Sequence, residues 1–187
     1  MMSFPIHFLP LSLIYTISIG LIYIIYLAKN HDETYAGPAQ SSKEYTPIVY
    51  VTVATMCLYY IFLLNQSYTA FHEFHQAKQA YREKKTEEKP SMLKIKYGSD
   101  NYNVHVANRT AGNLFEQLIP FIVSLYLYAT FVSVSGAAKY GWAWVFFRSY
   151  YGLAYKRPFP TLFLSTIPAY ICVWGMVGGT VYTLSKQ

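Results

Sequence analysis

The chain has 187 residues, of which 53% are hydrophobic and 13% are charged, and its formal net charge is +6. Because soluble domains carry about 25% charged residues, this composition excludes an intrinsically disordered chain and argues against an ordinary soluble domain. The uncharged residues are gathered in blocks, and the order of these blocks predicts the architecture.

The first block, residues 8–28, contains no charged residue. As a helix its 21 residues would be about 31 Å long, which matches the hydrocarbon core of one bilayer. Residues 1–7 contain no Lys or Arg, and the apolar run is longer than that of a cleaved signal peptide. We therefore predict a retained membrane helix, followed by a connector that ends at residue 44.

Four more blocks follow, and each predicts a further membrane helix. Two of them contain no Lys, Arg, Asp or Glu, and each of the other two encloses a single charged residue, Glu116 and Arg148 respectively. The block with Arg148 is the shortest. In chain order the four blocks are residues 45–71, the residues between Arg109 and Lys139, those between Lys139 and Lys156, and residues 159–185.

These five spans predict an all-α integral membrane protein with two parts. Residues 1–44 form an extra N-terminal membrane helix with its connector. Residues 45–187 form a four-helix membrane domain. The stretch 70–85 is rich in helix-forming residues, so we expect the first helix of this domain to continue beyond the membrane.

One connector carries most of the positive charge. Residues 78–96 contain seven basic and three acidic residues, a net charge of +4. The positive-inside rule places this connector on the cytoplasmic or matrix side, and five spans then bring Lys156 and Arg157 to the same side. Because the connector adjoins membrane helices and also contains Glu, we expect it to attract anionic lipid rather than nucleic acid.

Polar side chains recur at helical spacing in two of the spans. Offsets of four and three residues place the first set on one helix face, and offsets of three and four do the same for the second set. Ionisable residues inside a span are costly, so they usually face a partner or a polar cavity. The first set is Arg109, Asn113 and Glu116, and the second is Arg148, Tyr151 and Tyr155.

Two interpretations of these sets are open. In the first, Glu116 and Arg148 pair with each other across neighbouring helices, which satisfies both charges without a ligand. In the second, the two sets line a pocket at the membrane interface for a small zwitterionic ligand. Arginines bind carboxylates through two parallel hydrogen bonds, and Glu116 would accept from an ammonium group. Glutathione carries two carboxylates, one ammonium and one thiol.

The histidines and cysteines do not predict a metal site. His72 and His75 are three residues apart, whereas the metalloprotease pattern needs four, and no cysteine or further carboxylate completes the set. Cys57 and Cys172 lie in apolar spans without a CxxC spacing, and we expect both to be small buried apolar side chains.

Both polar sets resemble motifs of one membrane family. The stretch Arg109-Thr-Ala-Gly-Asn113-Leu-Phe-Glu116, followed by Pro120, resembles the R-A-x-x-N-x-x-E…P signature of membrane-associated proteins in eicosanoid and glutathione metabolism (MAPEG). The run from Arg148 through Tyr151 to Tyr155 resembles that family's R-x-x-Y-x-x-x-Y pattern in the following span. The resemblance covers residues 45–187 and is closest to the type three branch of microsomal glutathione transferases.

The resemblance implies a four-helix membrane fold that is usually trimeric, with glutathione bound between protomers. Members act on lipophilic substrates as glutathione transferases, peroxidases or eicosanoid synthases. It implies an organelle membrane, that of the endoplasmic reticulum or the mitochondrion. Carried over by motif, the residues that bind glutathione are Arg109, Asn113, Glu116, Arg148, Tyr151 and Tyr155, and Lys78 or Arg82 would add a contact to a carboxylate.

Three departures from the family pattern bear on activity. Thr110 follows the motif arginine where the family has alanine, and Leu162 stands where synthase members have the arginine that favours the glutathione thiolate. The helix at 8–28 is additional to the family's four. Two functions therefore stay open. One is a glutathione-dependent enzyme of lipophilic substrates, and the other is a catalytically silent subunit of a larger membrane complex, for example a respiratory one.

Overall fold

The computed structural model describes residues 41–186 except 85, 87, 88 and 99, together with residues 18 and 25. Apart from those two residues, the predicted membrane helix at 8–28 and its connector through residue 40 lie outside the described part of the chain.

The described residues form helices and contain no strand. A short 3-10 helix, η1, precedes six α helices. The elements are η1 (Ser42–Tyr45), α2 (Thr46–Arg82), α3 (Met92–Gly98), α4 (Tyr102–Phe131), α5 (Val134–Ser149), α6 (Tyr151–Tyr155) and α7 (Thr161–Leu184). The predicted all-α fold is confirmed.

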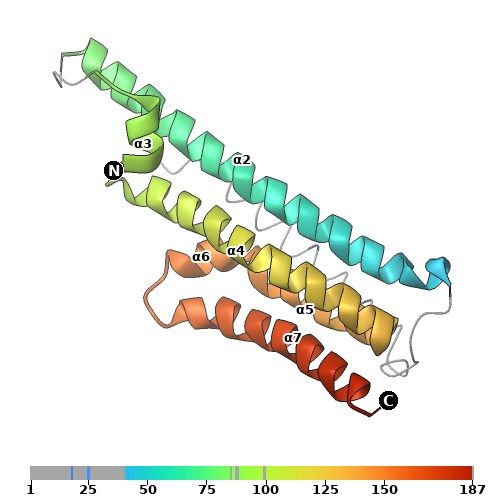
Figure 1. Ribbon diagram of the computed structural model, residues 1–187. Coiled ribbons are helices and arrows are strands. Elements are labelled where there is room, and N and C mark those ends of the chain that lie inside the picture. The colour runs from blue at the N-terminus through green and yellow to red at the C-terminus, as the bar shows by residue number, and fades with distance from the viewer. Residues whose placement is uncertain are drawn as a thin grey trace.

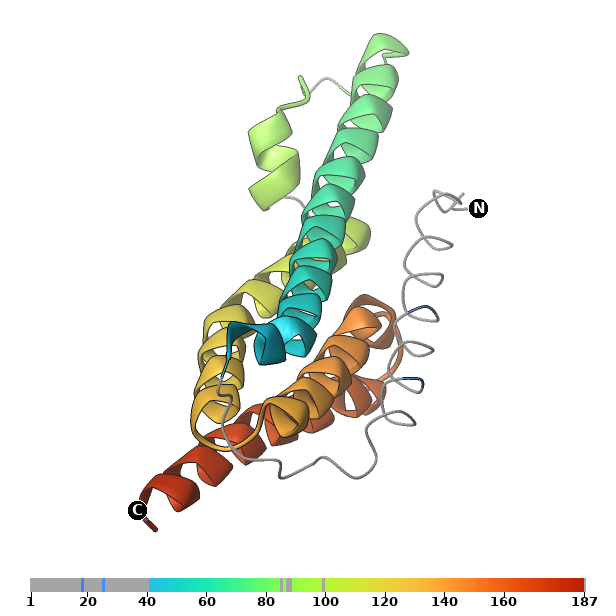
Figure 2. The same ribbon diagram turned by 90° about the vertical axis from the view of Figure 1, so that its right-hand side faces the viewer.

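Four long helices run alternately up and down and make one bundle (Figure 1). The turn between α4 and α5 and the C-terminus lie at one end, and α3 and α6 lie at the other (Figures 1 and 2). Lys156 and Arg157 follow α6 directly. The structure thus brings them to the same end as the 78–96 connector and the C-terminus to the opposite end, as expected from the span count.

Side-chain caps define where two of the helices begin. The Asn101 side chain accepts hydrogen bonds from the backbone nitrogens of Asn103 and Val104 at 2.9 and 3.3 Å, and α4 starts there. Ser133 accepts from the Gly136 nitrogen at 3.1 Å and starts α5. Each cap satisfies donors that the first turn of a helix leaves without a partner.

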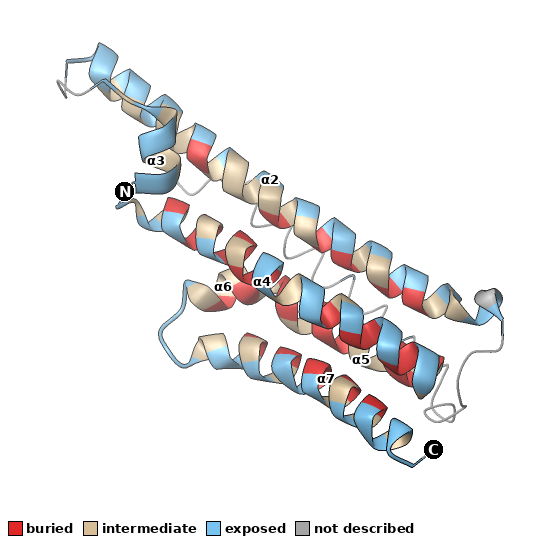
Figure 3. Cartoon of the chain, in the orientation of Figure 1, coloured by how far each residue is buried: buried red, intermediate tan, exposed pale blue. Residues whose placement is uncertain are grey.

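The core of the bundle is apolar and tightly packed. Phe121 of α4 stacks on Trp144 of α5 with ring centroids 3.8 Å apart and an interplanar angle of 6°. A Cβ added at Gly141 would lie 2.6 Å from Val51, so this glycine lets α5 approach α2 closely. Buried residues lie on the inner sides of the helices, and their outer sides are exposed (Figure 3). Many exposed residues on α2, α4 and α7 are large and apolar, as expected of a surface in lipid.

Within the described residues, α2, α4 and α7 are each long and apolar enough to cross a membrane. The fourth predicted span corresponds to α5, which has 16 residues and is largely buried between the other three. At Tyr150 the chain leaves α5 and enters α6. The chain is therefore an integral membrane protein whose shortest predicted span is an inner helix of the bundle.

The helix α2 is far longer than one bilayer. Its first part, from Thr46 to Gln66, is about 30 Å long, the thickness of a hydrocarbon core. The rest continues for a further ~24 Å to Arg82. The prediction that this helix continues through the stretch 70–85 is confirmed as far as Arg82.

Candidate functional site

Arg148 lies in the last turn of α5 and is only 1% exposed. Its Nη1 donates a hydrogen bond to Oδ1 of Asn113, on α4, at 2.6 Å. A buried guanidinium needs acceptors for its donors, because an unsatisfied buried polar group is costly. Asn113 provides one acceptor. It also joins the two predicted polar sets, because Asn113 belongs to the first and Arg148 to the second.

Three aromatic rings surround the same guanidinium. Its carbon Cζ lies 5.8 Å from the ring centroid of Trp144, 5.7 Å from that of Tyr151 and 5.8 Å from that of Tyr170. These distances are within the range of a cation–π contact, which stabilises the positive charge away from water. We refer to Asn113, Arg148 and these three aromatic residues as the Arg148 cluster.

Two donors of Arg148 have no partner. Nε and Nη2 are buried and make no hydrogen bond. These two nitrogens share one edge of the guanidinium, and that edge is the one that can present two parallel N–H groups to a carboxylate. The residues of the Arg148 cluster therefore fit an anionic ligand that carries a carboxylate.

Glu116 does not pair with Arg148. Its Oε1 instead lies 3.7 Å from Nη1 of Arg109 on the same helix, and the two side chains are 56% and 49% exposed. The interpretation in which Glu116 and Arg148 satisfy each other is therefore wrong. The reason lies in the helix crossing, which sets Asn113, and not Glu116, against Arg148.

The two motif tyrosines lie on α6. Tyr151 is buried, and its ring stacks on that of Tyr155 with centroids 6.0 Å apart. The hydroxyl of Tyr155 lies 3.3 Å from Nε2 of His105. The two predicted polar sets do not include His105, although it lies four residues before Arg109 and so on the same face of α4.

The helix α7 supplies a residue that the motifs did not include. The Tyr170 hydroxyl accepts a hydrogen bond from Nε2 of Gln117 at 2.9 Å, and the Tyr170 ring lies against Arg148. The pattern of the sequence carried no signal for this contact, because Tyr170 lies on a helix outside both polar sets. Only the packing of α7 on α4 and α5 brings it to the cluster.

Hydrogen bonds also give the level of the cluster along the bundle. Gln66, about 30 Å along α2 from Thr46, donates to Oδ1 of Asn108 at 3.0 Å. Along α4, Asn113 and Glu116 lie about 7 and 12 Å beyond Asn108. The site therefore lies close to the level of Gln66, toward the end of the bundle with α3 and α6.

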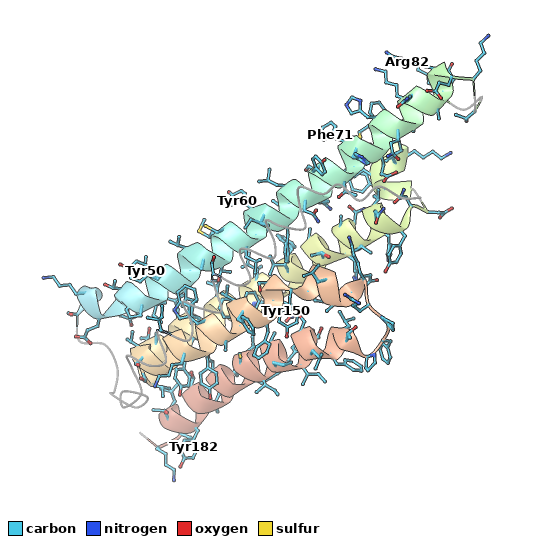
Figure 4. The ribbon with its side chains drawn as sticks, turned by 180° about the vertical axis from the view of Figure 1, so that it is seen from behind. Tyr50, Tyr60, Phe71, Arg82, Tyr150 and Tyr182 are labelled. Carbon is cyan, nitrogen blue, oxygen red and sulfur yellow. The ribbon has the colours of Figure 1, made fainter. Side chains whose placement is uncertain are left out.

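Lys78 and Arg82 lie elsewhere in the chain. Both are exposed and stand about 18 and 24 Å beyond Gln66 along α2. Figure 4 shows Arg82 at the far tip of α2, away from Tyr150, the residue between α5 and α6. The structure of the single chain therefore does not bring these two residues to the Arg148 cluster.

Metal-ligating groups do not gather in the described part of the chain, where no three His, Cys, Asp or Glu side chains come together. His72 lies 3.9 Å from Glu73 on the same helix. Cys172 is buried as expected, but Cys57 is exposed, so the expectation for Cys57 is wrong. Cys57 lies on the outer side of α2, and spacing within an apolar span cannot reveal which side faces out.

The fold and the site together define a class of protein, an integral membrane bundle of four long helices with a buried arginine between them. The chain belongs to the MAPEG family, whose family model matches residues 48–182. Neither the curated proteins nor the solved structures include a match to it.

Proposed function

We propose that the chain binds glutathione at the Arg148 cluster and conjugates it to, or uses it to reduce, lipophilic substrates. We place it closest to the type three branch of microsomal glutathione transferases. The observation that carries the proposal is the buried edge of Arg148, whose Nε and Nη2 make no hydrogen bond. A carboxylate of glutathione would accept from both nitrogens and remove the cost of two unsatisfied donors.

The charges around the cluster match the remaining groups of the tripeptide. Arg109 and Glu116 are about half exposed, so a ligand can reach both. Glu116 would accept from the ammonium group and Arg109 would bind the second carboxylate. In the homotrimer that the family resemblance implies, Lys78 or Arg82 of a neighbouring protomer would add a further contact to a carboxylate.

The chemistry places one demand on the site, the ionisation of the thiol, that Leu162 does not meet. Glutathione reacts through its thiolate, and a thiol with a pKa of about 8.5 is only a few per cent ionised at neutral pH. In conjugation with an aryl halide, the thiol loses its proton to water, the sulfur forms a bond to the ring carbon, and the carbon–halogen bond breaks as the halide leaves with its electron pair. Leu162, half-buried in the first turn of α7, offers no charge that would stabilise the thiolate.

Isothermal titration of the full chain with glutathione in detergent tests binding. Arg148→Gln keeps a polar group beside Asn113 but removes the charge and the paired donors, and we expect at least tenfold weaker binding. Arg157→Gln is the matched control, because it removes an exposed arginine outside the cluster. Absence of heat with the unmodified protein at millimolar glutathione would end the proposal.

Leu162 favours a second function. A chain that keeps the binding residues but has no arginine at this position fits a catalytically silent subunit of a larger membrane complex, for example a respiratory one. Native electrophoresis after mild solubilisation of the source membrane distinguishes the enzyme from the subunit of a complex. A free trimer with no larger species would count against the function as a subunit. Fractionation in the same experiment tests an endoplasmic reticulum or mitochondrial location, with residues 78–96 on the cytoplasmic or matrix side.

A further inference from the structure

Exposed apolar residues and positive charge also occur together outside the Arg148 cluster, on α3. In this short helix Leu93 and Tyr97 are 74% and 71% exposed. They are four residues apart, so both lie on one face of the helix. Because both are exposed, this face is turned away from α2, against which α3 packs. An apolar face of this kind beside a membrane helix needs a physical explanation.

Positive charge accompanies the exposed apolar residues in two segments. In α3, Lys94 and Lys96 flank them, and Nζ of Lys96 lies 5.3 Å from the ring centroid of Tyr97. In the loop between α6 and α7, Phe159 is exposed and Arg157 precedes it. Apolar side chains next to basic ones are typical of segments that lie in the headgroup layer of a membrane.

Both segments are held at the same level of the bundle. The Lys96 carbonyl accepts a hydrogen bond from Nδ2 of Asn108 at 2.6 Å, and His105 lies 3.3 Å from Tyr155, two residues before Arg157. His105 and Asn108 are one turn apart on α4.

One edge of the bilayer is expected near this level. Asn108 is hydrogen-bonded to Gln66, which lies about 30 Å along α2 from Thr46. A helix of that length matches the thickness of a hydrocarbon core. With Thr46 at the other edge, the two segments would lie where the acyl chains end and the phosphates begin.

We propose that α3 and the loop at 156–160 form a binding surface for anionic lipid headgroups. Leu93, Tyr97 and Phe159 enter the boundary of the acyl chains, and Lys94, Lys96 and Arg157 contact the lipid phosphates. Anionic lipid is the occupant because the surface lies at the edge of the bilayer that surrounds the bundle and carries cations beside its apolar residues. This surface is independent of glutathione binding, so each proposal can fail without the other.

The lipid selectivity of the full chain in vesicles tests whether Lys94, Lys96 and Arg157 bind anionic headgroups. Electron paramagnetic resonance of spin-labelled lipids compares phosphatidylglycerol with phosphatidylcholine at the protein surface. We expect phosphatidylglycerol to be favoured about threefold to fivefold at low salt and much less at molar salt, where the screening length is about 3 Å. The triple variant K94Q/K96Q/R157Q should lose this preference.

A variant with the same loss of charge is the matched control. K78Q/R82Q/K84Q removes three cations from the tip of α2, which begins about 18 Å beyond the interface level. Both variants are compared at physiological salt, where the screening length of about 8 Å is shorter than this distance, so the control should keep the preference. That result would confine to α3 and the loop at 156–160 the attraction for anionic lipid that the sequence predicts for the whole 78–96 connector. Equal loss in both variants, or no preference in the unmodified protein, would overturn the proposal.

The depth of Leu93 in the bilayer tests whether the exposed apolar residues enter the acyl chains. This measurement does not depend on the triple variant. A nitroxide at Leu93→Cys, in a chain with Cys57→Ala and Cys172→Ala, reports its contact with oxygen in lipid and with a polar relaxant in water. We expect a depth at the boundary of the acyl chains. A label that is fully accessible to the polar relaxant would contradict the proposal, because it would place this face of α3 in water. A label that neither oxygen nor the polar relaxant reaches would also contradict it and would indicate that a protein covers α3.

Discussion

Arg148 Nη1 donates a hydrogen bond to Asn113 Oδ1 over 2.6 Å, and this contact joins α5 to α4 inside the bundle. A residue of each polar motif thereby becomes part of one buried arrangement. The guanidinium keeps one buried edge without a partner, and this edge is where we propose that a carboxylate binds.

Removal of the Asn113 acceptor should destabilise the fold. In Asn113→Ala a third nitrogen of the buried Arg148 loses its partner, and we expect a loss of about 1.5–3 kcal/mol in the free energy of unfolding. Thermal unfolding in detergent measures it. Asn113→Asp keeps an acceptor beside the guanidinium and should stay close to the unmodified protein. Equal melting temperatures of Asn113→Ala and the unmodified protein would show that the hydrogen bond contributes nothing.

Glu116→Gln should separate binding from stability. Glu116 and Arg109 are both about half exposed at 3.7 Å, and an exposed ion pair contributes less than about 1 kcal/mol. The melting temperature should therefore change little. Loss of the negative charge should weaken glutathione binding at least tenfold in calorimetric titration, because the ammonium group loses its partner. Unchanged affinity would remove Glu116 from the proposed site.

Gly141→Ala should destabilise the bundle through a steric clash. The added Cβ would lie 2.6 Å from a methyl of Val51 and 3.0 Å from one of Leu125, and overpacking of this kind costs about 1–3 kcal/mol. Gly178→Ala is the control, because a Cβ there meets nothing within 4 Å and alanine favours a helix. We expect a lower melting temperature for the first variant and an equal or higher one for the second.

Leu162→Arg should raise reactivity if the site binds glutathione. A positive charge near the sulfur would lower the pKa of the thiol and increase the thiolate fraction at neutral pH. Ultraviolet absorbance of the bound thiolate and the rate with an aryl halide measure both effects. Leu164→Arg is the control, because Leu164 is exposed on the outer side of α7. Equal gains in the two variants would contradict a specific role for position 162.

The sequence by itself determined the helices and the register of polar residues along them. Helix formation and the offsets of three and four that place Arg109, Asn113 and Glu116 on one face are local properties of the chain. The length of an uncharged stretch can also be counted along the chain, so the long apolar helices could be predicted. The extension of α2 could be predicted from its run of helix-forming residues. The short span with Arg148 was the least typical, because its residues are buried by protein more than by lipid.

Only the tertiary structure decided which residues meet. Whether Arg148 contacts Asn113 or Glu116 depends on how α4 crosses α5, and the two acceptors differ by less than one turn of helix. Tyr170 reaches the cluster because α7 packs against both helices. The packing also decides that Cys57 lies on the exposed side of α2 and that Lys78 and Arg82 lie far from the Arg148 cluster. Such contacts join residues far apart in the chain, and no periodicity along one helix encodes them.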